Sequence, residues 1–415
     1  MALVARTFLI CCFLGSPLAA QDLPADHQHP AAADPARAWT WTTDANVFAG
    51  FNYQLRRFTD IAAWESQNWF MARAERRLAR GRLTINGMLS LEQLTLGRYV
   101  YTVGGVRFRP GGSPQLFQTG ESFEGAPLTH YQHPHDLIMN LGATYRVQGQ
   151  RITYMFGADL VGTPTLGPTP FMHRESGRNN PQVPLSHHNL DSTHITAGVV
   201  RAGAEVSAWT FEGSVFRGAE PDERRYDIDE PRLDSWAARV GWRRGPWHAQ
   251  FSGGRLDEPE WFAPYDQTRV TASAGFTGAM ASRPLAVTAA WGQTREYTPD
   301  AAISDAYLLE WDLRLTDTLA TFGRIETARK EIFRHAHIPG VAHPHFFSDI
   351  TALTLGGVYD VSFLGLNRLG RLGIGGDVTV YGMSADMELP YEGSRSFHAF
   401  LRWRPRTPAP EHHIH

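Results

Sequence analysis

The chain is nearly free of cysteine and has no long apolar run beyond its N-terminus. Its 415 residues include two cysteines, Cys11 and Cys12, which both lie in the N-terminal segment. No later stretch approaches the roughly 18 consecutive apolar residues that mark a membrane-spanning helix. The formal net charge is only -3, which argues against nucleic acid as a partner. The class of helical membrane proteins is therefore excluded, and nucleic-acid binding is not expected.

The N-terminus has the pattern of a secretory signal peptide. Arg6 is followed by an apolar run from Thr7 to Leu14, and small residues end at Ala20. We therefore expect a signal peptide over residues 1–20 and a flexible periplasmic lead-in over 21–44. The exported chain would have no cysteine, so no disulfide framework can stabilise it.

The rest of the chain is dominated by segments in which apolar and polar residues alternate. In 306–315, for example, Tyr307, Leu309 and Trp311 alternate with charged residues, and a period of two places these sets on opposite faces of a strand. The expected strands cover residues 45–57, 67–79, 81–97, 136–148, 150–163, 193–205, 207–218, 232–244, 246–257, 267–279, 284–296, 304–315, 319–331, 348–361, 368–382 and 395–405. Each has about the 9–11 residues that a tilted strand needs to cross a bilayer.

Short turns and longer connections alternate between these strands, as they do in bacterial outer-membrane barrels. Backbone groups in lipid must all be paired, which forces such a sheet to close. We predict an all-β fold, a closed antiparallel transmembrane β-barrel over residues 45–405. It would have about 16 strands (14 or 12 are the alternatives), short periplasmic turns, long extracellular loops and a tail over 406–415. Tryptophans near the strand ends fit aromatic girdles at the two lipid interfaces; they are Trp69, Trp209, Trp236, Trp242, Trp247, Trp291 and Trp403.

Histidines are concentrated in three of the expected long loops. His133-Pro134-His135 and His343-Pro344-His345 share a spacing that places two imidazoles on the same side of an extended segment, with Cα atoms about 6.5–7 Å apart. Paired imidazoles suit Cu(II) or Zn(II). The candidate metal ligands are His133, His135, Asp136, His187, His188, His194, His343 and His345. The alternatives are that these histidines only pin neighbouring loops together, or that they make gating sensitive to pH.

Charged residues recur on the face opposite the apolar one, and we expect them to face the interior of the barrel. The candidate pore-lining residues are Arg151, Asp159, Arg239, Arg269, Glu310, Asp312, Arg314, Arg371, Asp377 and Arg402. Their excess of arginine suggests a moderate anion preference; the alternative is a ladder of Arg–carboxylate pairs that only stiffens the wall. One or both of the connections 98–135 and 164–192 should fold inward, with residues 171–174 as a constricting segment or as an anchor on the wall.

Several stretches resemble those of a proteobacterial family without assigned function: QTGE, QHPHDLIMNLGATY, GPTPFMHR, PLSHHNLDSTHITAGVV and EPDERRYD. Over residues 45–405 the chain also looks like a Gram-negative outer-membrane β-barrel of porin size. Its broad plan is similar to that of copper-resistance outer-membrane proteins, although its N-terminal region is short and poor in methionine. The resemblance implies a location in the outer membrane, in contact with its lipids, and supplies no catalytic or ligand residue.

Three functions follow as expectations. The first is a passive channel for small polar solutes, constricted by inward-folded loops, with a homotrimer as the assembly suggested by analogy with porins. The second is metal binding in copper or zinc handling through the loop histidines. The third is an outer-membrane hydrolase, for which His187, His188 or His194 would be the base beside Ser186 or Ser192. We expect the chain not to be an enzyme, because no nucleophile motif stands out.

Overall fold

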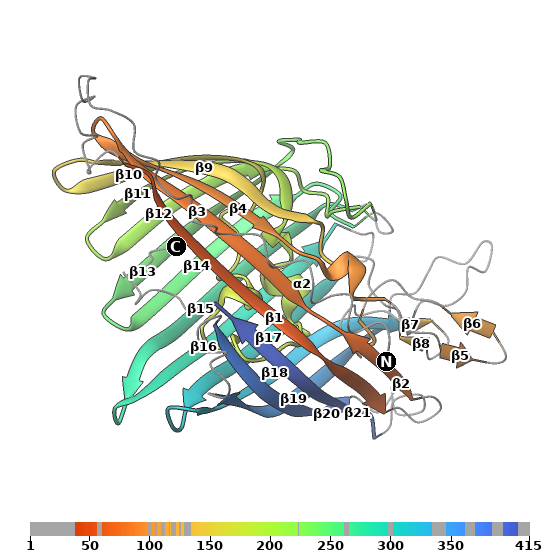
Figure 1. Cartoon of the computed structure of the whole chain (residues 1–415). Helices are drawn as coiled ribbons and strands as arrows, with labels where there is room; N and C mark the ends of the chain where they lie inside the picture. The colour runs from red at the N-terminus through yellow and green to blue at the C-terminus, as the bar shows by residue number, and fades with distance from the viewer. Residues whose placement is uncertain are drawn as a thin grey trace, which may run out of the picture. The chain divides into compact units, whose positions relative to one another are not determined.

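The fold is a closed antiparallel β-barrel of 16 wall strands (Figure 1). The computed structural model describes residues 38–55, 60–97, 101–103, 106–108, 113–115, 117, 122–123, 126–127, 134–222, 224–260, 265–297, 302–333, 346–361, 370–383 and 393–405. The expected signal peptide, most of the expected lead-in and the tail over 406–415 lie outside these residues. No helix among the described residues is long and apolar enough to cross a membrane.

The wall strands follow one another in chain order around the barrel. They are β1 (Thr40–Leu55), β2 (Ile61–Glu65), β3 (Asn68–Leu78), β4 (Gly81–Leu89), β9 (Ile138–Gln148), β10 (Ile152–Gly162), β11 (Thr196–Val206), β12 (Trp209–Phe216), β13 (Ser235–Arg244), β14 (Trp247–Leu256), β15 (Gln267–Met280), β16 (Arg283–Glu296), β17 (Ile303–Arg314), β18 (Leu319–Phe333), β19 (Phe346–Val361), β20 (Arg371–Met383) and β21 (Arg395–Arg404). β2 and β3 together fill one position, since both pair with β1. β1 also pairs with β21, which closes the sheet.

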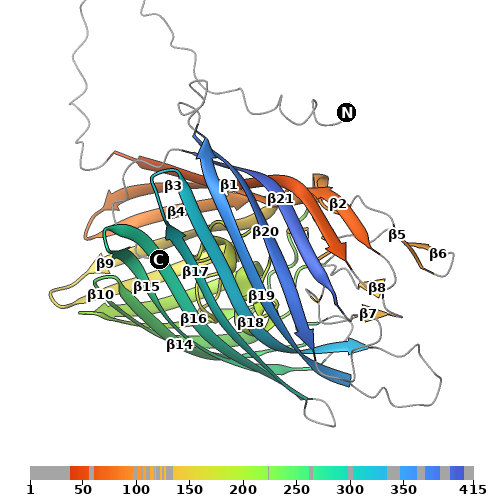
Figure 2. The same ribbon diagram turned by 90° about the horizontal axis from the view of Figure 1, so that it is seen from below.

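Tight turns join the strands at one end of the barrel, and long connections join them at the other. Ala79, Ser207, Ala281 and Ser282 have positive φ angles in these turns, as two-residue hairpin turns between twisted strands require. Four short strands lie within the connection between β4 and β9: β5 (Tyr101–Val103), β6 (Val106–Phe108), β7 (Ser122–Phe123) and β8 (Ala126–Pro127). Figure 2 shows the tilt of neighbouring strands β15 to β21.

The distribution of polarity is the reverse of that in a soluble protein. Tyr154, Phe156 and Leu160 on β10 are about half exposed, whereas Arg269, Arg324 and Arg402 are among the largest fully buried side chains. Apolar side chains thus face outward around the wall and charged ones face inward. An outward apolar band on a closed sheet is the surface that spans a lipid bilayer.

Some details differ from the expectations. β1 begins at Thr40 rather than at residue 45, and β2 is an additional wall segment. The strand expected over 81–97 ends at Leu89, after which the chain forms a short 3₁₀ helix, η2 (Glu92–Leu94). The expected girdle residue Trp69 is buried inside the barrel, where its ring lies 4.7 Å from that of His173; Trp209, Trp236 and Trp247 do face outward and are about half exposed.

Candidate functional site

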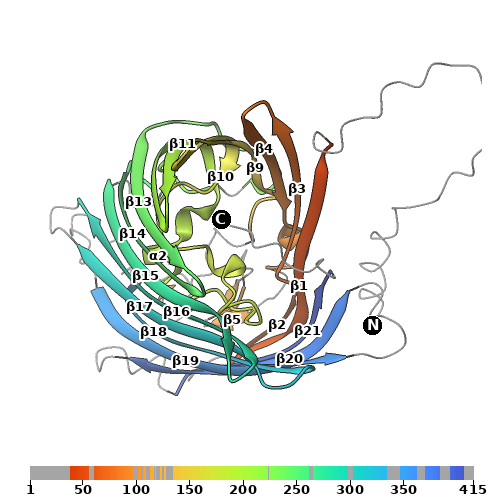
Figure 3. The same cartoon turned by 90° about the vertical axis from the view of Figure 1, so that its left-hand side faces the viewer.

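The connection between β10 and β11, residues 163–195, folds into the interior of the barrel and is called the inward loop below. It contains η3 (Phe171–His173), α2 (His187–Leu190) and η4 (Ser192–His194). Figure 3 looks along the barrel and shows α2 inside the ring of strands. Most of the loop is buried: Leu166, Leu185 and Leu190 are each 1% exposed or less. This position agrees with the expectation that one or both of the connections 98–135 and 164–192 fold inward.

Polar contacts bind the inward loop to a large part of the wall. Each contact joins a loop residue to an inward-facing residue of a strand: Gly167 N to Ser252 Oγ at 2.8 Å, Ser176 Oγ to Thr288 Oγ1 at 2.7 Å, Asn179 Nδ2 to Asp312 Oδ2 at 2.5 Å, Gln182 Nε2 to Asp377 Oδ1, Ser186 Oγ to Glu326 Oε2 at 3.1 Å and Asn189 Nδ2 to Ser304 Oγ at 2.8 Å. These partners lie on β14, β16, β17, β18 and β20, and Thr165 also bonds to Ser214 on β12 and to the Ala237 carbonyl on β13. The loop therefore covers this side of the interior.

An ionic network lies at the centre of these contacts. Arg174 donates from Nε to Glu310 Oε1 at 2.5 Å and from its terminal amine to Asp191 Oδ2 at 2.6 Å. Glu310 also accepts from Arg324 on β18 at 3.3 Å. Burial alone would raise the pKa of Asp191, but Arg174 and then His187 hold that pKa below its ordinary value. The buried charges are thus mutually compensated, as such charges must be.

Glycines let the backbone of the inward loop approach the wall. A Cβ at Gly292 on β16 would lie 2.3 Å from the carbonyl oxygen of Asn189 in α2. Gly167 has a φ of +85° and would place a Cβ 2.1 Å from the carbonyl oxygen of Leu190. Only glycine fits such close approaches without displacing the loop.

Three buried histidines meet where the inward loop passes the start of β9. Nε2 of His135 and Nε2 of His194 are 3.3 Å apart, and the ring centroids of His187 and His194 are 5.1 Å apart. Each Nδ1 atom has an oxygen partner: Glu92 for His135 at 2.7 Å, Asp191 for His187 at 2.6 Å, and the Asp191 carbonyl for His194 at 2.8 Å. Burial lowers the pKa of His187 and, by more, that of His194. These histidines connect two loops, which is the pinning role expected as an alternative.

The predicted metal ligands do not form one cluster. His133, His343 and His345 lie outside the described residues. Asp136 forms an ion pair with Arg225 at 3.1 Å, and its pKa is raised to about 6, chiefly by burial. His188 points to a separate group, with Nδ1 3.6 Å from Glu260 Oε1. In the described part of the chain, a set of three or more side chains with metal-ligand spacing is found for His188, Glu220 and Glu260.

No pattern in the sequence points to several of these partners. Glu92, Glu220 and Glu260 lie far from the histidines along the chain and follow no spacing rule. From the sequence, Arg174 is expected only as part of the constricting segment over residues 171–174. Its neighbour Phe171 is an anchor, since it is 8% exposed and its ring lies 5.3 Å from that of His187.

The candidate pore-lining residues fall into three groups. Arg269, Glu310, Asp312, Asp377 and Arg402 are buried beside the inward loop, Asp159, Arg239 and Arg314 are paired on the wall, and Arg151 and Arg371 are exposed. Arg151 lies in the turn before β10 and Arg371 begins β20, so both are at the short-turn end. Whether these two line the interior therefore stays a prediction, because exposure at the short-turn end is compatible with either side of the wall.

Apart from contacts with residues 163–167 and with His173, the inward loop leaves the inner faces of β3 and of β9 to β13 partly open. These strands, called the uncovered wall below, carry a series of ion pairs. Arginines and carboxylates pair within β3, between neighbouring strands and, from β9 to β11, across β10: Arg73 with Glu75 at 2.5 Å, Arg146 with Glu205 at 2.7 Å, Arg201 with Asp159 at 2.6 Å and Arg239 with Glu212 at 2.9 Å. These arginine side chains are 19–27% exposed, against 3% for Arg174. Solvent therefore reaches this side of the interior, and the ladder expected as an alternative to free charge is present there.

The geometry defines a membrane-spanning β-barrel of the outer-membrane type with a loop folded into its interior. Solved structures with this fold are outer-membrane proteins: OmpF of Salmonella typhi in complex with daunomycin (TM-score 0.53, 8% identity, 88% of this chain and 97% of that chain) and an anion-selective porin from Comamonas acidovorans (0.51, 10%, 88% and 100%). A loop-deletion variant of OmpT from Vibrio cholerae is a third (0.50, 10%, 88% and 99%). No family model and no curated protein sequence matches the chain. These likenesses agree with the predicted outer-membrane location.

Proposed function

We propose that the barrel is an outer-membrane channel for small polar solutes, restricted by its inward loop. The observation that carries this proposal is the asymmetry of the interior. Most polar contacts of the loop are to β14, β16, β17, β18 and β20, while the paired arginines of β3, β9, β11 and β13 stay 19–27% exposed. A polar passage along the uncovered wall follows from this arrangement.

A cavity of about 40 Å³ lies where the inward loop meets β1 and β3, lined by Asn46, Gln67, Asn68, Trp69, Met172 and Gly177 among others. We propose that it is a narrow part of the passage. At about 10–15 Å³ for each water, this is room for a few molecules only. Solutes larger than small polar molecules or ions would require the loop to move.

Conductance across a planar bilayer tests the channel. The purified protein should give stepwise conductance, and a barrel that inserts without producing any steps overturns the proposal. Arg146→Glu should shift the ratio of anion to cation permeability toward cations, because Arg146 is 27% exposed on the uncovered wall. Arg232→Glu is the matched control, since Arg232 forms a 64%-exposed pair with Glu230 outside the barrel wall.

The hydrolase alternative has no comparable support in the geometry. Ser186 Oγ donates to Glu326, and Ser192 Oγ accepts a hydrogen bond from Arg269 at 2.8 Å. The two hydroxyls thus bond to charged side chains of the wall rather than to the histidines expected as the base. The homotrimer remains a prediction, which the mass of the detergent-solubilised protein tests.

A further inference from the structure

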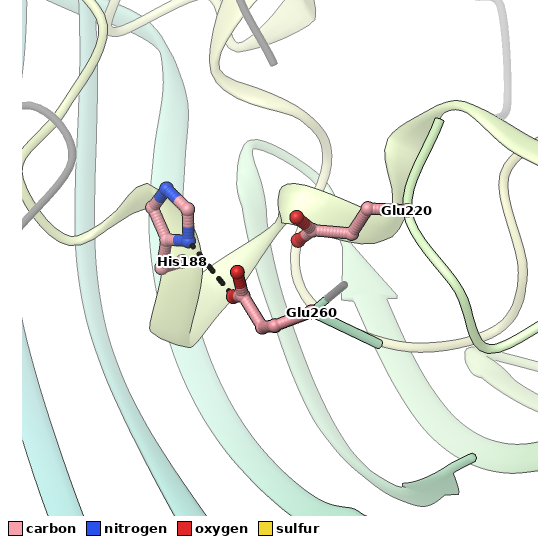
Figure 4. A group of neighbouring side chains, drawn as sticks. All are labelled: His188, Glu220 and Glu260. Carbon is pink, nitrogen blue, oxygen red and sulfur yellow. Dashed lines mark ion pairs between the residues drawn. The ribbon is translucent and has the colours of Figure 1, made fainter. Parts of the chain in front are cut away.

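Three side chains from three different connections converge at the long-loop end of the barrel. His188 belongs to α2 of the inward loop, Glu220 to the connection between β12 and β13, and Glu260 to the connection between β14 and β15 (Figure 4). One donor atom from each lies within 4.8 Å of the other two. His188 Nδ1 and Glu260 Oε1 are 3.6 Å apart.

We propose that His188, Glu220 and Glu260 bind a divalent transition-metal cation, with Zn(II) as the ion that fits best. One imidazole and two carboxylates are a ligand set that zinc takes at about 2.0–2.2 Å, and a water would complete a tetrahedral shell. The absence of thiolate ligands disfavours Cu(I), and the imidazole disfavours Ca(II). The site goes beyond the proposed channel and does not depend on it.

A second observation indicates that the group is built to receive a cation. Glu220 Oε1 is buried and has no hydrogen-bond partner in the described part of the chain, and Figure 4 shows its carboxylate turned toward that of Glu260. Burial first, and the charge of Glu260 next, raise the pKa of Glu220 well above its ordinary value. A buried carboxyl oxygen without a partner, turned toward a second carboxyl group, is the arrangement that a bound cation stabilises.

The rival explanation is that neighbouring cations already compensate the two carboxylates. Arg269 and Lys330 are 1% and 4% exposed and interact electrostatically with this group. If they suffice, the cluster is an ion-pair network that needs no metal. Zinc affinity separates the two explanations directly.

A metal bound at this site would affect the position of the inward loop. A metal bound there would join the inward loop to two connections at the long-loop end, because each ligand comes from a different one. Binding would therefore hold α2 in place. Slower amide exchange of residues 187–190 with Zn(II) than without it is the expected effect.

The experiment titrates Zn(II) into metal-free protein by calorimetry. The unaltered protein should bind one more Zn(II) ion than the Glu220→Gln variant, or bind that ion at least tenfold more tightly. The His188→Gln and Glu260→Gln variants should show the same loss of one bound Zn(II) or of affinity. Glu258→Gln is the matched control, because Glu258 is exposed two residues from Glu260 and should bind as the unaltered protein does. Any zinc bound elsewhere on the chain is common to every variant and cancels.

Equal stoichiometry and affinity in the unaltered protein and the three variants would overturn the site. So would a loss confined to one variant, since all three ligands are required. Retention of the folded barrel is checked by its migration on unheated gels. Should Glu220→Gln not fold, His188→Gln and Glu260→Gln decide the matter, because those side chains are 16% and 12% exposed.

Discussion

Arg174 on the inward loop places its Nε 2.5 Å from Oε1 of Glu310 on β17. Both side chains are almost fully buried, at 3% and 1% exposure. Forming a buried ion pair of this kind costs desolvation free energy, so the pair adds little net stability. Removing one partner, however, leaves a buried charge without compensation and destabilises the loop.

Arg174→Ala should therefore release the inward loop. The change leaves Glu310 and Asp191 without their shared cation, which costs about 3–5 kcal/mol for a buried pair. Hydrogen exchange should show faster exchange of amides in residues 170–191, with the wall strands unchanged. Arg232→Ala, in an exposed pair, should alter exchange by no more than about 1 kcal/mol. Unchanged protection of the loop would show that other contacts hold it.

A disulfide can test whether the loop lies inside the barrel. Ser176 Oγ and Thr288 Oγ1 are 2.7 Å apart, close to the roughly 2.05 Å between bonded sulfurs. Ser176→Cys with Thr288→Cys should form a disulfide on mild oxidation, because loop and wall already meet there. The product is detected by cleavage between the two positions followed by a gel without reductant. Ser176→Cys alone should form no cross-link within the chain, and reduced thiols in the double variant would contradict the placement.

The close approach at Gly292 predicts a graded steric effect. A methyl group there would meet the Asn189 carbonyl oxygen at 2.3 Å, so Gly292→Ala should lower the free energy of loop opening by about 1–3 kcal/mol, as overpacking does. Exchange of the α2 amides measures this change. Gly213→Ala is the control, because its Cβ would have a nearest neighbour at 3.8 Å. Equal effects of the two substitutions would argue against the contact.

The sequence predicted the wall better than the contents of the barrel. The alternation of Tyr307 and Leu309 with charged residues such as Glu310 can be read from a short stretch of sequence. Because alternate residues of a strand lie on the same face, this alternation identifies both the strands and their outward faces. The partners of the loop could not be found in this way. Arg174 and Glu310 are 136 residues apart, and Glu220 and Glu260 approach His188 only after the barrel has closed. The histidine motif at 133–135 predicted a shared metal, whereas His135 binds Glu92 on an unrelated segment.

The last prediction concerns pH and the contact between His135 and His194. Burial, then His187 and His135, hold the pKa of His194 well below 6.5, against a smaller opposing effect of Asp191. The unfolded loop therefore binds a proton on His194 at pH values where the folded loop does not. Neutral His194 therefore contributes fully to the stability of the folded loop above about pH 6.5, and this contribution is lost as the pH falls below that value.

Exchange of the amides of residues 192–195, corrected for intrinsic rates, should show lower protection at pH 5 than at pH 7. His194→Gln should flatten this dependence and His248→Gln should not, since His248 lies on β14 outside the histidine contact. A dependence that persists unchanged in His194→Gln would assign the effect to another group.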